Sequence, residues 1–287
     1  MNPLLSIVIA NYNYGRYLAE AIESVISQSC TDYELIIVDG GSTDGSVDVI
    51  KKYESKLAWW VSEPDGGQSN AFNKGFAHAR GKFLTWLNAD DVFLPGAIDS
   101  LRRASEKYPN CKWFVAGVLW LDPEMKIINC GRGREFSEIR YRSGFVNGCG
   151  PSTFFSKQLY DAAGGVDERF HLMMDSDLWL RFAKLGFRYR PCCDYAWGLR
   201  LHPGAKMSNH NFDENGNLDL SKVGRANDDH SEHQCRVKEE TAMMLYGFHV
   251  EKLTKLRRLL SVSWRQVALA RIDLCKWRGK QYKEVFK

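Results

Sequence analysis

The feature that most constrains this chain is a regular alternation of short apolar runs and amphipathic segments over residues 1–120. Strand-like apolar runs occupy residues 4–10, 34–39, 57–63, 82–87 and 112–120. The segments between them carry apolar residues at helical spacing. This alternation predicts β-α-β units around a mainly parallel sheet, and the nearly continuous apolar character of the runs predicts that helices cover both faces of it.

The alternation weakens after Trp120, where glycine-rich stretches precede two helical segments, 157–165 and 175–186. Residues 204–234 are polar and lack periodicity, which predicts a flexible loop. We therefore expect one main domain over 1–203, in two halves that meet near Trp120. The loop 204–234 and a basic helical extension over 235–287 should follow it.

Composition points to an ordinary globular protein, with 44% apolar and 26% charged residues. The eight cysteines form no C-x-x-C pair, which argues against a zinc ribbon or a redox motif and fits a reducing compartment. The apolar run at 4–10 is too short for a signal peptide core or a membrane span. A cytoplasmic location is therefore expected.

The C-terminal extension is strongly basic. Residues 251–287 hold eleven lysines and arginines against three acidic residues. An apolar stripe at helical spacing runs through it, made of Leu253, Leu256, Leu260, Trp264, Val267, Leu274 and Trp277. Two interpretations stay open: the stripe packs on the main domain or on a second subunit, or it attaches the protein to the inner face of an anionic membrane.

Polar residues directly follow each of the first four apolar runs. They are Asn11, Asp39, Asp65 and the group Asn88, Asp90 and Asp91. Ligands of an open α/β sheet bind beyond the carboxyl ends of its strands, so these side chains should share one site. Carboxylates can bind a base and a ribose, and a diphosphate in a cleft requires a cation. Oxygen ligands of this kind select Mg²⁺ or Mn²⁺ rather than zinc.

The motif WLNADD at the end of a strand, preceded by IANYNYGRYLAEAIESVISQS, ELIIVDGGSTDGS and SEPDGGQSNAFNKGF, resembles glycosyltransferase family 2. Its members are inverting enzymes with the GT-A fold, a Rossmann-like α/β architecture. The similarity covers Leu4 to Pro203. GPSTFFSKQLYDAAGGVDERF resembles the family's acceptor-side segment, and MMDSDLWLRFAKLG resembles its catalytic-base helix. The resemblance makes 1–120 the donor half and 121–203 the acceptor half.

Residue by residue, the resemblance implies that Asn11, Asp39 and Asp65 contact the nucleoside. It implies that Asp90 lies against the ribose or donor sugar, that Asp91 binds Mn²⁺ or Mg²⁺, and that Asp175 is the catalytic base. The family usually has an acidic pair at the start of the base helix, whereas this chain has Met174 there, and Asp177 is a second candidate.

Four further residues have two interpretations each. Asn88 stands where the commonest motif has Asp, and its amide could still accept a ribose hydroxyl or a metal-bound water. His202, in RLHPGAK, matches a position that supplies a metal or diphosphate contact in some relatives, or is structural. Trp179 and Trp197 either line an acceptor site or belong to the core. A cluster at His230, His233 and Cys235 lacks a fourth ligand and does not predict a metal site.

The resemblance implies a metal-dependent hexosyl- or N-acetylhexosaminyl-transferase with a nucleotide-sugar donor, weighted towards UDP. The acceptor would be a glycan or a lipid-linked hydroxyl in cell-surface polysaccharide or glycolipid synthesis, and no nucleic acid partner is expected. A dehydrogenase would have G-x-G-x-x-G after the first strand, where this chain has IANYNYGRY. A non-catalytic nucleotide-sugar-binding protein remains the alternative.

Overall fold

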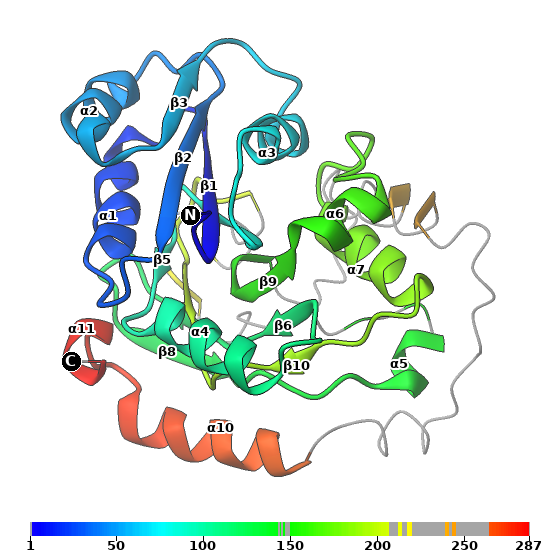
Figure 1. Ribbon diagram of the computed structural model, residues 1–287. Helices are drawn as coiled ribbons and strands as arrows, with labels where there is room; N and C mark the ends of the chain where they lie inside the picture. The colour runs from blue at the N-terminus through cyan, green and yellow to red at the C-terminus, as the bar shows by residue number, and fades with distance from the viewer. Residues whose placement is uncertain are drawn as a thin grey trace.

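The computed structural model describes residues 2–142, 144, 146, 150–206, 212–213, 217–219, 239–240, 243–244 and 264–286. These residues form two β-sheets with helices on both faces of the larger one (Figure 1). The larger sheet, in order, contains β10 (Arg190–Pro191), β6 (Trp113–Val115), β9 (Thr153–Ser156), β4 (Phe83–Asn88), β1 (Leu5–Asn11), β2 (Tyr33–Asp39) and β3 (Trp59–Ser62). The smaller sheet contains β5 (Val92–Phe93), β11 (Trp197–Arg200), β7 (Val118–Leu121) and β8 (Ile127–Gly131).

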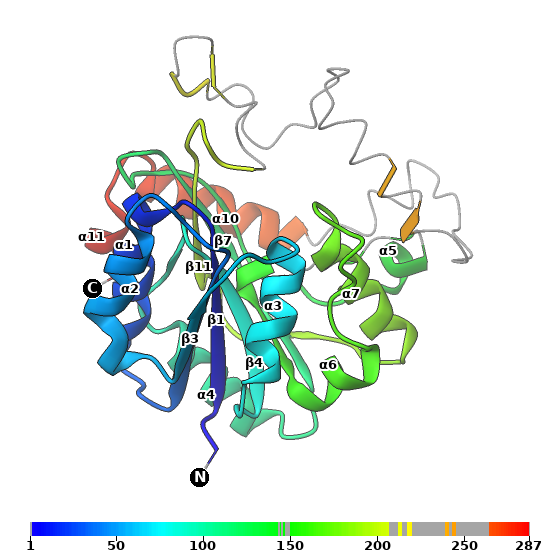
Figure 2. The same ribbon diagram turned by 90° about the horizontal axis from the view of Figure 1, so that it is seen from above.

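The helices separate into two layers around the larger sheet. In chain order the α-helices are α1 (Gly15–Ile26), α2 (Ser46–Tyr53), α3 (Gln68–Ala77), α4 (Ala97–Lys107), α5 (Glu138–Arg142), α6 (Lys157–Ala163), α7 (Met174–Lys184), α10 (Trp264–Trp277) and α11 (Tyr282–Val285). Short 3₁₀ turns cover Glu54–Lys56 and Gly150–Ser152. Helices α1 and α2 lie on one side of the sheet, and α3, α6 and α7 on the other (Figure 2).

Side chains of the central strand alternate between these two layers, as the pleat of a strand requires. Val8 belongs to the core under α3 and α7, whereas Ile7 and Ile9 belong to the core under α1 and α4. Strand β1 pairs in parallel with β2 and β4, and β2 pairs in parallel with β3. The expected mainly parallel sheet, covered on both faces, is therefore confirmed. The antiparallel β9 is inserted between β4 and β6.

The prediction of one strand over 112–120 is wrong in one respect. The structure has two strands there, and they belong to different sheets. Strand β6 ends at Val115, and β7 begins at Val118. Gly117 lies between them in a crowded position, where a Cβ would come within 2.0 Å of the Asp194 carbonyl oxygen. Only a glycine fits this crossing between the sheets. A continuous apolar run could not reveal it.

The C-terminal helices pack on the smaller sheet. Leu274 and Trp277 of α10 lie against the core formed by β5, β7 and β8, and Trp277 makes edge contacts with Tyr195 and Phe286. For these two residues the packing interpretation of the stripe is confirmed, and they are not available to enter a membrane. The side chains of Trp264 and Val267 and all of Leu253, Leu256 and Leu260 lie outside the described residues, as does most of 204–234. None of the described helices is long and apolar enough to cross a bilayer.

A buried ion pair fixes α10 to this sheet. The Asp273 carboxylate accepts hydrogen bonds from Arg132 Nε and from the Tyr195 hydroxyl, each at 2.7 Å. The side chain of Asp273 is only 10% exposed, whereas that of Asp194, which also pairs with Arg132, is 56% exposed.

We expect Asp273→Ala to lower the free energy of unfolding by about 3 to 5 kcal/mol, because it leaves the Arg132 charge buried with one partner fewer. Asp194→Ala, the matched control, should cost less than about 1 kcal/mol, since an exposed ion pair contributes little. Urea unfolding followed by tryptophan fluorescence measures both. Equal losses in the two variants would contradict this account of how α10 is held.

Candidate active site

The polar residues at the strand ends meet at one edge of the larger sheet, because β1 to β4 are parallel and in register there. Asn11 lies opposite Asp39 in the register of β1 and β2, and its Nδ2 donates to Asp39 Oδ1 at 2.6 Å. Ser62 ends β3 opposite Asp39, and its hydroxyl donates to Asp39 Oδ2 at 2.6 Å. The sheet thus gathers Asn11 and Asp39 as the sequence predicts.

Asp39 is fully buried, and all its acceptor positions are in use. Its carboxylate accepts from Asn11, from Ser62, and from both the amide and the hydroxyl of Ser42, at 2.9 and 2.6 Å. Burial alone would raise the pKa of Asp39, but these hydrogen bonds outweigh it and hold the pKa below its usual value. A nucleoside can reach this carboxylate only by displacing one of the two serine hydroxyls, since four donors already fill its lone-pair sites.

Asn11 and Asp65 flank Asp39. Asn11 is 3% exposed, and no donor among the described residues reaches its Oδ1. A buried acceptor without a partner is costly, so a ligand that donates there gains affinity. Asp65 is half-buried and accepts from the amide of Gly67 at 2.7 Å. Its carboxylate approaches the backbone so closely that a Cβ on Gly40 would lie 3.1 Å from it.

The two carboxylates after β4 have different surroundings. Asp91 is 1% exposed, and both its oxygens are engaged: Oδ1 accepts from the amide of Arg200 at 3.0 Å and Oδ2 from Asn88 Nδ2 at 2.7 Å. Burial, followed by repulsion from Asp90, raises the pKa of Asp91 well above its usual value. Each oxygen of Asp91 thus already accepts one hydrogen bond within the protein, and the expectation that Asp91 binds the metal stays a prediction.

Asp90 instead lies beside the expected histidine. Asp90 Oδ2 is 3.1 Å from His202 Nε2, and the backbone carbonyl of Asp90 accepts from Arg200 Nε at 3.0 Å. The His202 ring lies 4.6 Å from the Tyr17 ring, which fixes its plane. A carboxylate oxygen and an imidazole nitrogen at this separation can both bind one divalent cation.

Asn88 positions protein groups rather than facing outward. Besides donating to Asp91, it accepts at Oδ1 from Gln68 Nε2 at 2.9 Å. Ser69, which follows Gln68 in the chain, donates to the carbonyl of Phe170 at 2.6 Å, and Phe170 lies four residues before the start of α7. The first turn of α3 therefore bridges the Asp90 loop and the helix that begins at Met174. Each end of its amide therefore has one protein partner, and a direct substrate contact for Asn88 stays a prediction.

Asp175 lies in the first turn of α7, as the sequence predicts. Its Oδ1 accepts from the amide of Ser176 at 2.6 Å, and desolvation by burial raises its pKa above the usual aspartate value in spite of that bond. A raised pKa makes a carboxylate a better proton acceptor. Asp177 instead forms a salt bridge with Arg181 at 2.6 Å. Because Arg181 also donates to the carbonyls of Ala163 and Gly165, Asp177 serves to join α7 to the end of α6.

The two tryptophans do not line an acceptor site. Trp179 is fully buried and stacks between Trp86 and Trp113, at 5.5 and 5.7 Å, so the expectation of acceptor contact is wrong for it. Trp197 is 8% exposed in β11, and its indole lies close enough to Asp91 to favour the charged carboxylate. Both residues therefore support the site from within the core.

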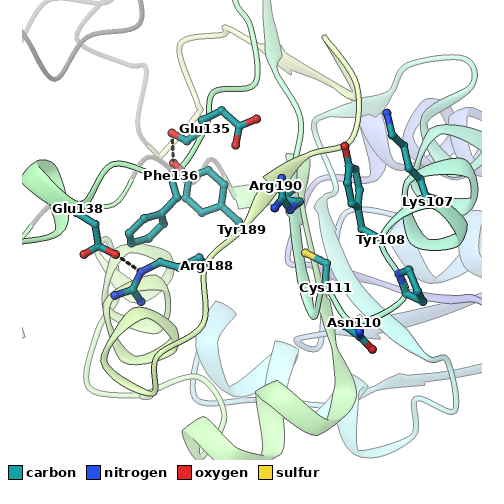
Figure 3. A pocket seen from close by; sticks show the side chains of 11 residues that line it. Lys107, Tyr108, Asn110, Cys111, Glu135, Phe136, Glu138, Arg188, Tyr189 and Arg190 are labelled. Carbon is teal, nitrogen blue, oxygen red and sulfur yellow. Dashed lines mark hydrogen bonds and ion pairs between the residues drawn. The ribbon is translucent and has the colours of Figure 1, made fainter.

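The cavity of about 660 Å³ shown in Figure 3 lies elsewhere, beside β10 and the residues that precede β6. This is the edge opposite the carboxyl ends of the parallel strands. Its two arginines already have protein partners: Arg188 donates to Glu138 at 2.5 Å and packs over Phe136, and Arg190 lies over Tyr108. It is not a competing active site on these grounds.

Several residues of the site were not predicted. Gln68 lies inside the SEPDGGQSNAFNKGF motif, and Arg200 directly precedes LHPG, but nothing in either residue type marks it as part of a site. Tyr14 was also missed. Burial, and then the charges of Asp90 and Asp91, raise the pKa of Tyr14 to about 12, which places it at the same edge.

Comparisons with known proteins agree with this architecture. Residues 6–118 match the model of the family described as Glycosyl transferase family 2. An uncharacterized glycosyltransferase of Nostoc sp. is 46% identical over 118 residues, which are 40% of this chain and 35% of that protein. The chondroitin synthase of Pasteurella multocida is 24% identical over 77% of this chain and 25% of its own length. The chain spans from about a third to three fifths of the length of the relatives it matches first.

Solved structures share the fold. S. aureus TarS 1–349 in complex with UDP-GlcNAc aligns with a TM-score of 0.55 at 16% identity, over 88% of this chain and 68% of that one. The mannosyltransferase PcManGT of Pyrobaculum calidifontis, in complex with GDP-Man and Mn²⁺, aligns with a TM-score of 0.53 at 16% identity, over 95% and 87%. The chain is therefore similar to glycosyltransferase family 2 over residues 6–118, and it has the GT-A fold of these solved glycosyltransferases.

Proposed function

We propose that this protein transfers a sugar from a nucleoside-diphosphate sugar to an acceptor hydroxyl, with inversion at the anomeric carbon. One observation carries the proposal: two groups of polar side chains lie at the same sheet edge. The first group is Asn11, Asp39 and Asp65, and the second is the Asp90–His202 pair. Helix α3 connects this edge to the helix of Asp175. A non-catalytic binding protein would need the first group only. Release of nucleoside diphosphate from a donor separates the two functions.

The donor end of the site suits a nucleoside. The unpaired Asn11 Oδ1 can accept from an imide or a hydroxyl, and Asp65 can accept from a ribose. Uridine is the favoured base, in keeping with the UDP-GlcNAc complex of the structural neighbour TarS. The transferred group is then a hexose or an N-acetylhexosamine.

Asp175 is the proposed base of a single displacement. Its carboxylate takes the proton of the acceptor hydroxyl while that oxygen bonds to the anomeric carbon and the bond from this carbon to the diphosphate breaks. Because the attacking oxygen and the leaving group lie on opposite sides of the sugar, the base and the diphosphate contacts must come from different parts of the chain. Asp175 on α7 and Asp90 after β4 meet that requirement.

Asp90 and His202 would hold the divalent cation, Mn²⁺ or Mg²⁺. The described residues contain no cluster of three or more metal-ligating side chains, so two protein ligands would have to be completed by diphosphate oxygens and water. When bound, the cation would neutralise the charge on the departing diphosphate. Tyr17 and Arg200 keep the pair in place, through the His202 ring and the Asp90 carbonyl respectively.

We expect Asp90→Asn and His202→Ala to weaken Mn²⁺-dependent nucleotide-sugar binding by at least about tenfold, since even outer-shell changes around a metal site cost that much. Isothermal titration calorimetry with and without chelator measures the metal-dependent part. His78→Ala, an exposed histidine stacked on Trp59 far from the site, is the matched control. Wild-type affinity of the two site variants in Mn²⁺ would refute this assignment.

Asp175→Asn should lower turnover by about 10²- to 10⁴-fold, because it keeps the shape of the side chain and removes its basicity. The raised pKa of Asp175 also predicts the pH profile: wild-type activity is gained as pH rises through a value above the usual aspartate range, and the variant lacks this limb. The control Asp177→Asn should reduce stability and retain the limb. If turnover falls in Asp177→Asn and not in Asp175→Asn, Asp177 is the base instead.

The acceptor is proposed to be a glycan or a lipid-linked hydroxyl of a cell-surface pathway, reached at an anionic membrane surface. Leu274 and Trp277 are committed to packing, so such contact would depend on exposed basic residues: Arg271 and Lys276 in α10, and Arg278 directly after it. Electrostatic attraction of this kind contributes about 1 kcal/mol per basic residue.

Changing Arg271, Lys276 and Arg278 together to Glu should abolish sedimentation with anionic liposomes at low salt. The same change at Lys51, Lys52 and Lys56, exposed beside α2, should leave sedimentation intact. If the wild type ignores the liposomes, or if both triple variants lose binding equally, membrane attachment through α10 is excluded.

A further inference from the structure

The turn that precedes the helix of Asp175 is held by a carboxylate from far along the chain. Glu240 accepts hydrogen bonds from three successive backbone amides, those of His171, Leu172 and Met173, at 3.1, 2.8 and 2.9 Å. The segment that carries Glu240 lies next to the turn that leads into α7. Successive amides that converge in this way form a backbone nest for an anion.

Glu240 is a buried, charged residue of the fold. It is 5% exposed, and burial alone would raise its pKa, but the three amides outweigh burial and hold the pKa of Glu240 below its usual value. Hydrogen bonds to a charged acceptor are about twice as strong as neutral ones. The carboxylate therefore stays ionised and keeps all three amides in one geometry.

A second contact fixes the same segment. Residues 239–240 and 243–244 are helical. Met244, four residues after Glu240, is 6% exposed and belongs to the core that contains Leu178 and Trp179 of α7. Glu240 thus contacts the turn before α7, and Met244 packs in the core that contains the buried side of α7.

The turn is connected directly to the proposed base. Met173, whose amide donates to Glu240, accepts through its carbonyl from the amide of Asp177 at 2.9 Å, in the first turn of the helix. Asp175 lies between these two residues, and no side chain caps the start of α7 locally. On the other side, the carbonyl of His171 accepts a hydrogen bond from Lys206. Glu240 therefore sets the position of the peptide from which the first turn, and Asp175 with it, begins.

We propose that Glu240 is a positioning residue for catalysis, which orients Asp175 by fixing the turn 171–173. This inference rests on the proposed function, since it assigns Glu240 to the same site. It makes the C-terminal segment a part of the catalytic apparatus, although that segment lies well beyond the family match at residues 6–118. Glu240 itself does not touch the reacting atoms in this account.

Glu240→Ala should lower kcat by about 10- to 100-fold, because a displacement of about 1 Å at a reacting group costs that much. Donor affinity should be unchanged, since none of the hydrogen bonds of Glu240 reaches Asp90, His202 or Asn11. Glu240→Gln keeps the volume and one acceptor oxygen, so its kcat should fall between those of Glu240→Ala and the wild type. Glu239→Gln, the exposed neighbour, is the matched control and should behave as the wild type.

The experiment measures three quantities on full-length protein well below its melting temperature: kcat for transfer or hydrolysis of UDP-GlcNAc, the Kd of the same donor, and hydrogen exchange of a peptide that covers residues 171–175. The inference requires a lower kcat, an unchanged Kd and faster exchange in Glu240→Ala, with partial recovery in Glu240→Gln. Wild-type kcat in a folded Glu240→Ala that has only a lower Tm would overturn it, because Glu240 would then be merely structural. Unchanged exchange would overturn it as well.

Failure of the proposed function is a separate outcome. If the wild type releases no nucleoside diphosphate from UDP-GlcNAc or from GDP-mannose, the proposed activity is wrong, and a positioning role in it falls too. Faster exchange in Glu240→Ala would then support the anchoring of the turn alone. If the wild type turns over and only the exchange result is negative, the proposed function stands and the assignment of Glu240 is rejected.

Discussion

The site depends on one buried carboxylate. Asp91 connects the end of β4 in the larger sheet, through Asn88, with the backbone of β11 in the smaller sheet, through the amide of Arg200. An ionisable group with 1% exposure must have hydrogen bonds on both oxygens to remain in the core. Once Asp91 is fixed in this way, the preceding residue, Asp90, is directed to His202. The two adjacent carboxylates are therefore held in different surroundings.

This constraint explains why the site requires the whole chain rather than its first half. The family match ends at residue 118, at the first residue of β7. The groups that would complete the proposed site come later: Asp175 on α7, Arg200 and His202 at the end of β11, and Glu240 beyond them. The smaller sheet, held by α10 through Asp273, positions β11. A change on the far side of that sheet can therefore reach the site through β11.

Much of the fold and of the candidate site could be predicted from the sequence, because local residue patterns determine these parts. The strand ends gave Asn11, Asp39 and Asp65 their common edge, since parallel strands in register leave no other place for them. The helix of Asp175 was predicted within a residue of where it begins. The sequence could not predict that Asp90 and Asp91 have different surroundings, because adjacent carboxylates look alike in a sequence. Only their burial in the structure distinguishes them. Trp179 was ambiguous for the same reason, and Glu240 carries no local signal, since its partners lie about 70 residues away.

The most direct test of this account is anomalous diffraction from a crystal of the protein soaked with Mn²⁺ and a non-hydrolysable nucleotide sugar. The account predicts one manganese peak within coordination distance of Asp90 Oδ2 and His202 Nε2, on the diphosphate, with the Asp91 carboxylate still bonded to Asn88 and to the Arg200 amide. A peak on Asp91, or a manganese ion bound away from the ends of β4 and β11, would contradict it.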